Sequence, residues 1–323
     1  MRFFRFLCVA LLSCWAGLSQ AAGFTFIEVP ASQGQPALRG AVWTPCNKAA
    51  GQIALGPMRI DGSEDCAIAG TQLPLIVFSH GSGGSFLGHH DTAAALADAG
   101  FVVAAINHPG DNFQDLSRQG SLSVFLTRPN DLTRLVDYLL GAWPGRSQLD
   151  ADRIGVFGFS RGGFTGLVAA GGKPQWRMFT DLCPAASPVP LCTDIANGAL
   201  PPMPENDSRI RAAVIVDPLP VFNRDGLSQL HVPIQLWASA QGGDGVTLER
   251  VTALRDALPV APDWHVATGA GHFAFLAPCS AAMAEMAPEI CRDGPGFDRT
   301  SFHRDFNAKV SAFFQRHLKR GGQ

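Results

Sequence analysis

The sequence carries little charge and has no concentration of basic residues. Charged residues make up 16% of its 323 residues, and 25 lysines and arginines against 27 acidic residues leave a formal net charge of −2. Binding to a phosphate backbone requires clustered positive charge, so this pattern argues against nucleic acid as a partner. Internal repeats and low-complexity tracts are also lacking, whereas 46% of the residues are hydrophobic. That is enough apolar material for a large buried core.

Long apolar runs are missing after the first 22 residues. No later segment reaches the roughly 18 uncharged apolar residues of a membrane-spanning helix, so we expect a soluble mature protein. Residues 1–21 differ, because two arginines precede an apolar stretch at residues 6–18 and a small-x-small site ends at Ala21. This pattern predicts a cleaved signal peptide and a periplasmic or secreted protein. The alternative is a lipoprotein attached through Cys14, whose surroundings loosely resemble a bacterial lipobox.

Cysteine is scarce but evenly numbered. Two of the 8 cysteines lie in the predicted signal peptide. An even number in the rest of an exported chain indicates disulfides formed in an oxidising compartment. These cysteines form three close pairs along the chain. We expect disulfides between neighbours, although spacing alone leaves other pairings open: Cys46–Cys66, Cys183–Cys192 and Cys279–Cys291. The sequence lacks the CxxC and HxxxH spacings that would favour a zinc site.

Apolar runs separated by segments of helix length follow one another from Leu73 onward. Such runs indicate strands buried on both faces, which occur in a parallel sheet with crossover helices. We expect these strands at residues 75–78, 101–106, 153–158, 212–216, 233–237 and 265–267. Helical spacing predicts helices at residues 91–98, 130–140, 247–258 and 302–318.

The residues before this region alternate between apolar and polar. Residues 24–29 and 38–43 therefore suit antiparallel strands at a sheet edge. Together these patterns predict one α/β domain over residues 22–323, with a mostly parallel central sheet, helices on both faces and disulfide-stapled loops. In such a sheet, functional groups gather at the carboxyl ends of the strands.

A G-x-S-x-G motif follows the third of the predicted apolar strands. Gly158-Phe159-Ser160-Arg161-Gly162 lies between the run ending at Phe157 and an apolar helix starting near Phe164. In this strand–turn–helix setting, the glycines permit a sharp turn that raises the serine Oγ above the sheet. The N-terminal N–H groups of the helix point toward negative charge that develops there. The motif predicts Ser160 as a nucleophile rather than a residue of a plain glycine-rich turn.

A serine hydroxyl needs a general base, and nine histidines compete for that role. His272 follows the last predicted strand, which agrees with the chain order Ser…Asp…His expected after this motif. Four histidines precede Ser160, where the base is not expected. His303 and His317 fall in the terminal helix, where we expect them to be solvated. The sequence therefore predicts His272 as the base.

The acid that orients this base has two candidates. Asp217 ends the predicted strand at residues 212–216, and Asp244 lies in the loop after the next strand. A carboxylate in this role accepts the second imidazole N–H and stabilises the imidazolium that forms. Both residues lie between Ser160 and His272, so chain order does not choose between them.

An oxyanion hole needs two backbone donors near the nucleophile. One is normally the N–H of the residue after it, here Arg161, and the other comes from a loop that follows an earlier strand. The glycine-rich loop at residues 79–84 supplies the second donor, and Ser82 is the expected residue. His80 then braces the loop and is not a base.

These segments together resemble α/β-hydrolases of the platelet-activating-factor acetylhydrolase and predicted dienelactone-hydrolase-like group. The similarity is carried by residues 75–81, residues 100–105, the turn at Ser160 and residues 209–217. In the acetylhydrolases the acid follows the strand after the serine's strand, so the resemblance favours Asp217 and keeps Asp244 as the alternative. Dienelactone hydrolases carry a cysteine where this chain has Ser160, which favours ordinary ester hydrolysis. The resemblance implies no metal and no organic cofactor.

The sequence thus predicts an exported serine esterase that cleaves short- to medium-chain carboxylic esters, which include acyl groups on lipids or polyesters. A peptidase on the same fold and a non-catalytic exported binding protein are the alternatives. The proline-rich segment 173–208 is expected to be either a lid over the site or a stapled surface loop. The segment His89-His90-Asp91 is expected to begin a helix rather than to bind a metal. The oligomeric state is left open.

Overall fold

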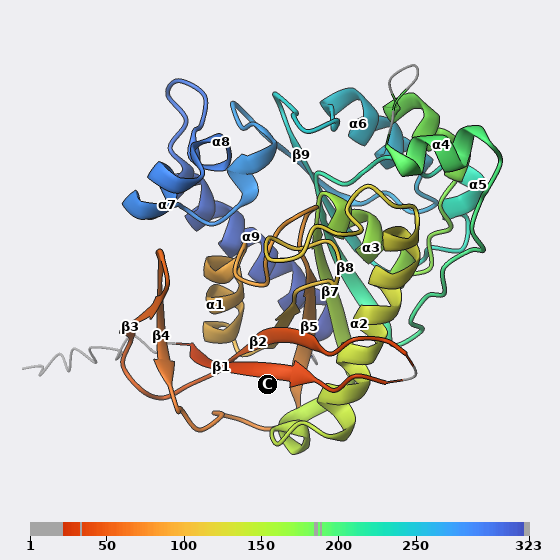
Figure 1. The fold of residues 1–323 in the computed structure, drawn as a ribbon. Coiled ribbons are helices and arrows are strands. Elements are labelled where there is room, and N and C mark those ends of the chain that lie inside the picture. Colours follow the sequence, from red (N-terminus) through yellow and green to blue (C-terminus); the bar gives the residue numbers. More distant parts are fainter. Residues whose placement is uncertain (1–21, 33, 184–186, 188, 320–323) are drawn as a thin grey trace, which may run out of the picture.

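The computed structural model describes residues 22–32, 34–183, 187 and 189–319. Within these residues, ten strands form one sheet in the order β10-β9-β8-β7-β5-β6-β2-β1-β4-β3 (Figure 1). The predicted signal peptide and Cys14 lie outside the described residues. No described helix combines the length and the apolar character that a membrane span requires.

One half of the sheet is parallel and contains the six apolar strands that the sequence predicts. Neighbouring strands from β10 to β6 all pair in parallel. Every residue of β5 and β6 is buried, because helices cover both faces and leave no solvated side. The prediction is confirmed for β5 Leu73–Ser79, β6 Val102–Ile106, β7 Leu149–Phe159, β8 Ile210–Val216, β9 Ile234–Ser239 and β10 Asp263–Ala267.

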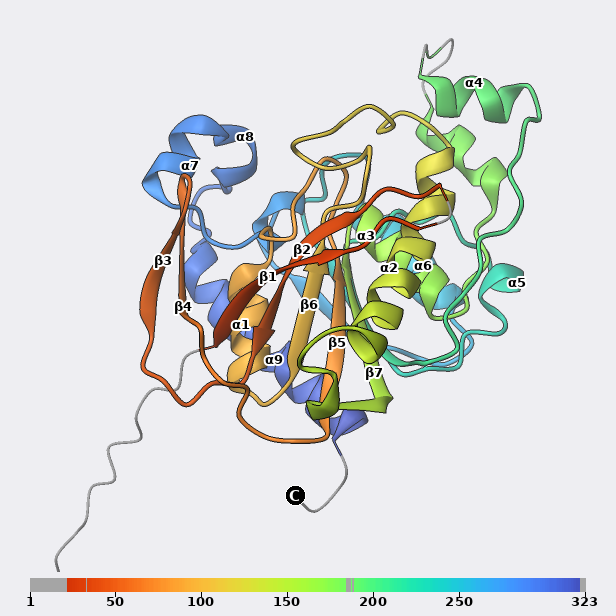
Figure 2. The same cartoon turned by 60° about the horizontal axis from the view of Figure 1, so that its bottom comes forward.

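The other half of the sheet is built mainly from antiparallel pairs. β2 (Leu38–Thr44) pairs antiparallel with both β6 and β1 (Gly23–Val29), as the alternating pattern predicts. These two strands are not the edge itself, because a hairpin of β3 (Gly51–Leu55) and β4 (Met58–Glu64) lies outside them (Figure 2). The hairpin was not predicted individually. Its strands are short and mostly exposed or half-buried, so the apolar pattern is weak.

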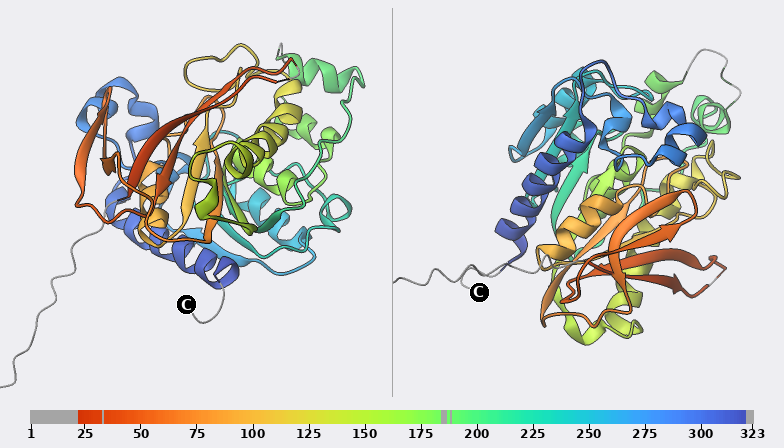
Figure 3. Two further views of the ribbon diagram at one scale, coloured as in Figure 1. Left: turned by 90° about the horizontal axis from the view of Figure 1, so that it is seen from below. Right: turned by 90° about the vertical axis from the view of Figure 1, so that its left-hand side faces the viewer.

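Helices cover both faces of the sheet (Figure 3). α1 (His90–Asp98) and α9 (Arg299–Leu318) pack on one face, whereas α2 (Ser123–Gly141), α3 (Arg161–Ala169) and α6 (Leu248–Ala257) pack on the other. The shorter helices are η1 Arg146–Gln148, η2 Trp176–Leu182, α4 Pro190–Ala196, α5 Arg224–Leu227, η3 His272–Phe275, α7 Ala281–Met286 and α8 Pro288–Cys291.

Helix α2 differs from its prediction. It begins at Ser123 rather than near Asn130, because it continues through Pro129 instead of starting after it. A proline removes one helical hydrogen bond, but Pro129 is buried in the packed face of the helix. Burial against the sheet therefore outweighs the local preference.

The three predicted disulfides are confirmed. Cα–Cα distances of 5.9, 5.7 and 5.8 Å join the neighbouring pairs Cys46–Cys66, Cys183–Cys192 and Cys279–Cys291. They tie the end of β2 to the end of β4, η2 to α4, and the segment after η3 to α8. Each closes a short loop outside the parallel core.

Candidate active site

Ser160 lies in the tight turn between β7 and α3, at the carboxyl end of the sheet. Its backbone has a positive φ of 56°, which is uncommon for a residue with a side chain. The flanking glycines are required sterically. A Cβ at Gly158 would collide with the carbonyl of Gly162, and one at Gly162 would collide with the carbonyl of Ser79. The result is a strained turn that fixes the position of Ser160.

His272 begins η3, just after the loop that follows β10. Its Nδ1 lies 2.6 Å from Asp217 Oδ2, and only 2% of the residue is exposed. The ring packs against Phe159, the residue before Ser160, with 4.7 Å between the ring centroids. Its Nε2 is buried and has no hydrogen-bond partner in the described part of the chain. With Nδ1 donating to a carboxylate, Nε2 is the nitrogen that can accept a proton.

Asp217 follows β8 and is fully buried. Ser239, the last residue of β9, donates its N–H to Oδ1 at 2.9 Å and its hydroxyl to Oδ2 at 2.7 Å. Together with the bond to His272, these contacts satisfy the buried carboxylate and fix its orientation. Ser239 was missed from the sequence, although its place at the carboxyl end of the neighbouring strand was a usable signal.

Asp244, the other candidate acid, has a different environment. It is exposed and lies in the turn that joins Gly243 to Val246, where its φ is 47°. His272 Nδ1 donates its hydrogen bond to Asp217 and not to Asp244. The structure thus brings Asp217 to the imidazole and leaves Asp244 in a turn.

The loop after β5 lies directly beside Ser160. A Cβ placed on Gly81 would come within 3.3 Å of Ser160 Cβ. Among the hydrogen bonds of the described residues, none is donated by the N–H of Ser82 or of Arg161. Both N–H groups can therefore donate to a ligand oxygen near Ser160.

His80 supports this loop from inside. Its Nδ1 donates to the Gly81 carbonyl at 2.6 Å, and its Nε2 accepts the N–H of His108 at 3.2 Å. Burial and the nearby Arg128 guanidinium lower the pKa of His80 to about 3. Because both ring nitrogens are engaged and the ring is held neutral, His80 is a structural support for the loop.

A second serine–histidine–aspartate chain lies behind the loop after β5. His108 Nδ1 lies 3.0 Å from Asp131 Oδ2, and His108 Nε2 lies 3.0 Å from Ser79 Oγ. All three side chains are buried, and Arg128 donates to the same Ser79 Oγ at 3.2 Å. This chain was not foreseen from the sequence, because its members lie far apart and His108 precedes Ser160.

The predicted solvation of His303 is wrong. The residue is 2% exposed, and its Nδ1 lies 2.6 Å from Asp91 Oδ2. α9 packs against α1 and the sheet, so the inner side of the helix is buried. His90 begins α1, and the described residues contain no group of three or more histidine, cysteine or acidic side chains that could hold a metal ion.

The segment 173–208 has two parts with different surroundings. Trp176 and Phe179 of η2 are buried and stack with 5.9 Å between their ring centroids, so this part belongs to the core. In the second part, α4 lies against the loop after β6, where the Leu191 N–H donates to the Gly120 carbonyl at 2.9 Å. The first part is therefore anchored in the core through these two side chains. For the second part, a lid and a surface loop both stay predictions.

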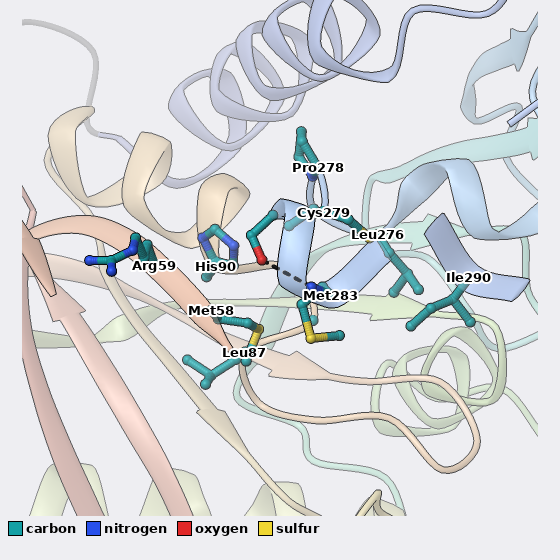
Figure 4. A pocket seen from close by; sticks show the side chains of 12 residues that line it. Met58, Arg59, Leu87, His90, Leu276, Pro278, Cys279, Met283 and Ile290 are labelled. Carbon is teal, nitrogen blue, oxygen red and sulfur yellow. Dashed lines mark hydrogen bonds between the residues drawn. The ribbon is translucent and has the colours of Figure 1, made fainter. Parts of the chain in front are cut away.

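A small cavity lies apart from Ser160, between the β3–β4 hairpin, the start of α1 and the segment after η3. Its volume is about 70 Å³. Figure 4 shows Met58, Leu87 and Met283 around it, with His90 at its side. The lining is mainly apolar, and the cavity does not include the proposed reacting groups.

Comparisons with known proteins match part of the chain to a family model and its fold to solved structures. A family model of platelet-activating factor acetylhydrolase, isoform II, matches residues 32–117, a stretch that holds the loop after β5 but not Ser160. The comparison with curated proteins finds no match. A solved structure of a ferulic acid esterase from Streptomyces cinnamoneus shows 18% identity and a TM-score of 0.64, and covers 94% of this chain and 91% of that chain.

A second solved structure is a dienelactone hydrolase from Anabaena variabilis ATCC 29413. It shows 16% identity and a TM-score of 0.54, with coverage of 92% of this chain and 99% of that chain. The chain therefore has the α/β-hydrolase fold. Its resemblance to the acetylhydrolase and dienelactone-hydrolase group is confirmed at the level of fold and partial family match, and it resembles hydrolases of the esterase type.

Proposed function

We propose that this chain is an exported serine hydrolase that cleaves short- to medium-chain carboxylic esters. The observation that carries the proposal is the unpartnered Nε2 of His272, on a ring that is hydrogen-bonded to buried Asp217 and packed against Phe159, the residue before Ser160. A histidine that is fixed at one nitrogen and open at the other can act as a general base for a nearby hydroxyl.

In the proposed reaction, His272 Nε2 takes the proton of the Ser160 hydroxyl while Oγ attacks the ester carbonyl. The N–H groups of Ser82 and Arg161 donate to the oxyanion of the tetrahedral intermediate. The intermediate collapses, His272 gives its proton to the leaving alkoxide, and an alcohol departs. Water then attacks the acyl-enzyme with His272 again as the base, which releases the acid and restores Ser160.

Asp217 is the proposed orienting acid. It accepts three hydrogen bonds, two from Ser239 and one from His272, and it has no arginine or lysine partner among the ion pairs of the described residues. It therefore stays available to stabilise the positive charge that forms on the imidazole during the reaction. Asp244 has the correct chain order but an exposed position, which supports the choice of Asp217.

The ester class rests on Ser160 in place of the cysteine of dienelactone hydrolases and on the similarity to an esterase of this fold. Export rests on the leader-like sequence of residues 1–21 and on the three disulfides. Lipid or polyester esters are finer possibilities within the same reaction class.

The test is hydrolysis of p-nitrophenyl acetate, butyrate and decanoate by the mature protein, with Ser160→Ala in parallel. We expect turnover of the two shorter esters and a loss of about 10⁴-fold or more in kcat for the variant. Circular dichroism checks that both proteins are folded. A folded, oxidised wild type that hydrolyses none of these esters would favour the non-catalytic binding protein.

A further inference from the structure

Asp111 is a fully buried carboxylate that lies behind the loop after β5. Its Oδ1 accepts the N–H of Gly83 at 3.1 Å and the hydroxyl of Ser82 at 3.3 Å. Its Oδ2 lies 2.6 Å from an amino nitrogen of Arg128 and 3.0 Å from one of Arg161. One carboxylate therefore contacts both residues whose backbone N–H groups form the proposed oxyanion hole.

Arg128 extends the contact to the beginning of the loop and to α3. It is 1% exposed and donates to the His80 carbonyl, to Ser79 Oγ at 3.2 Å and to Thr165 Oγ1 at 3.2 Å. A planar guanidinium with several fixed donors holds its partners in one geometry. Arg128 thus joins the loop after β5 to the helix that follows Ser160.

Arg161 is fixed at its side chain as well as by its place in α3. Its guanidinium donates to the Gln119 carbonyl at 2.9 Å and lies 4.9 Å from the centroid of the Phe125 ring. The loop after β6 thereby contacts the residue that follows the nucleophile. Figure 1 shows the loops after β5 and β6 side by side at this end of the sheet.

The charges on this network are stable at neutral pH. Burial alone would raise the pKa of Asp111, but the guanidinium groups of Arg128 and Arg161 outweigh it and hold the pKa below its ordinary value. Burial lowers the pKa of Arg128 to about 10, which leaves it protonated. Breaking a buried, paired charge is strongly unfavourable, so the network resists displacement of the loop.

We propose that Asp111 is a positioning residue that holds the two donors of the oxyanion hole, at Ser82 and Arg161, in the geometry of the transition state. The inference rests on the proposed serine-hydrolase function. Donors stabilise an oxyanion only when they are oriented before the charge develops, so a loosened loop lowers kcat while ground-state binding is largely kept.

The test is Asp111→Asn, which keeps the shape of the side chain and removes its charge. We expect kcat for p-nitrophenyl acetate to fall about 10- to 100-fold, with KM changed less than about threefold. Affinity for a trifluoromethyl ketone, which forms a tetrahedral adduct with the serine, should fall by a similar factor. A purely structural role would lower the amount of folded enzyme without this split between kcat and KM.

Asp150→Asn is the matched control. Asp150 is also a buried aspartate paired with an arginine, since its Oδ2 lies 2.7 Å from Arg153 Nε, but it lies at the opposite end of β7 from Ser160. We expect a comparable loss of stability and a kcat within about twofold of the wild type. If Asp111→Asn does not fold, Arg161→Met takes its place, with the same split between kcat and KM expected.

The outcomes separate the two proposals. A wild type that turns over no ester overturns the proposed function and this inference together. An active wild type with a folded Asp111→Asn variant of unchanged kcat and unchanged ketone affinity overturns only the role of Asp111. An equal loss of kcat in Asp111→Asn and Asp150→Asn overturns it too, because the effect would then be one of general stability.

Discussion

The protein contains two serine–histidine–aspartate chains of side chains. One consists of Ser160, His272 and Asp217, and the other of Ser79, His108 and Asp131. Both chains are buried, and in both the histidine Nδ1 contacts an aspartate. They differ at Nε2, which is unpartnered in the described structure at His272 and bonded to Ser79 at His108. The same three residue types therefore form an open acceptor in one place and a closed structural link in the other.

The charges around the two chains differ as well. Burial and the Arg128 guanidinium hold the pKa of His108 well below its ordinary value, and burial raises the pKa of Asp131 to about 7. An imidazolium at His108 is therefore strongly disfavoured, so this ring cannot take the proton of a serine during a reaction. The two sets of residues therefore differ in the open nitrogen at His272 and in the disfavoured imidazolium at His108, although their residue types are the same.

The largest expected effect is on kcat, and it should differ between variants of His272 and His108. His272→Ala should lower kcat for p-nitrophenyl esters by about 10⁴-fold or more and leave the protein folded. His108→Ala should keep kcat within about tenfold of the wild type but lower the free energy of unfolding by about 3 kcal/mol, because Asp131 is left buried without its partner. Ester turnover and urea unfolding measure the two quantities. A greater kcat loss at His108 than at His272 would reverse the assignment of the two chains.

The next effect concerns the two candidate acids. Asp217→Asn should lower kcat by about 10³- to 10⁴-fold, since an amide neither orients the correct tautomer nor stabilises the imidazolium. Asp244→Asn is the matched control and should stay within about twofold of the wild type, because the residue is exposed. Steady-state kinetics on p-nitrophenyl butyrate decides between them. Equal activity of wild type and Asp217→Asn would remove Asp217 from the site.

The smallest expected effect is on stability as a function of pH. Burial lowers the pKa of His80 to about 3 and that of His89 to about 4, and it also lowers the pKa of His108. As the pH falls below about 6.5, the unfolded chain binds protons that these folded residues do not, so the free energy of unfolding falls by up to about 1.4 kcal/mol per pH unit for each histidine. Asp131 and Asp98 act in the opposite direction, because burial raises their pKa values to about 7 and about 6, which favours folding at low pH.

The contribution of the three histidines exceeds that of the two aspartates, so we expect the protein to lose a few kcal/mol of stability between pH 6.5 and about 4.5. Urea unfolding at several pH values measures this slope. His80→Gln, which removes one of the titrating groups, should flatten it. A stability that is flat or rises over this range would contradict the neutral state of the buried histidines.

Much of the fold and part of the site follow from local patterns. The apolar runs predict the parallel strands, and the turn that holds Ser160 depends on neighbouring residues alone. His272 follows from chain order, and the disulfides join cysteines that are close in sequence. These features are encoded within short stretches of the chain, so a single sequence reveals them.

The remaining features depend on contacts between distant segments. Asp217 and Asp244 have equivalent chain order, and only the folded sheet places Asp217 beside His272. Asp111 and Arg128 lie far from Ser160 in the sequence, so their contacts with the loop after β5 leave no local signal. For the same reason His303 was expected in solvent, although its helix packs against α1.

In the proposed function, Ser160 and not Ser79 is the activated serine. The most direct measurement is reaction of the mature, oxidised protein with a fluorophosphonate, followed by mass spectrometry of the intact protein and of its peptides. We expect one adduct per chain, located on Ser160 and abolished by Ser160→Ala. An adduct on Ser79, or a folded protein that turns over esters without any adduct on Ser160, would contradict this assignment of the activated serine.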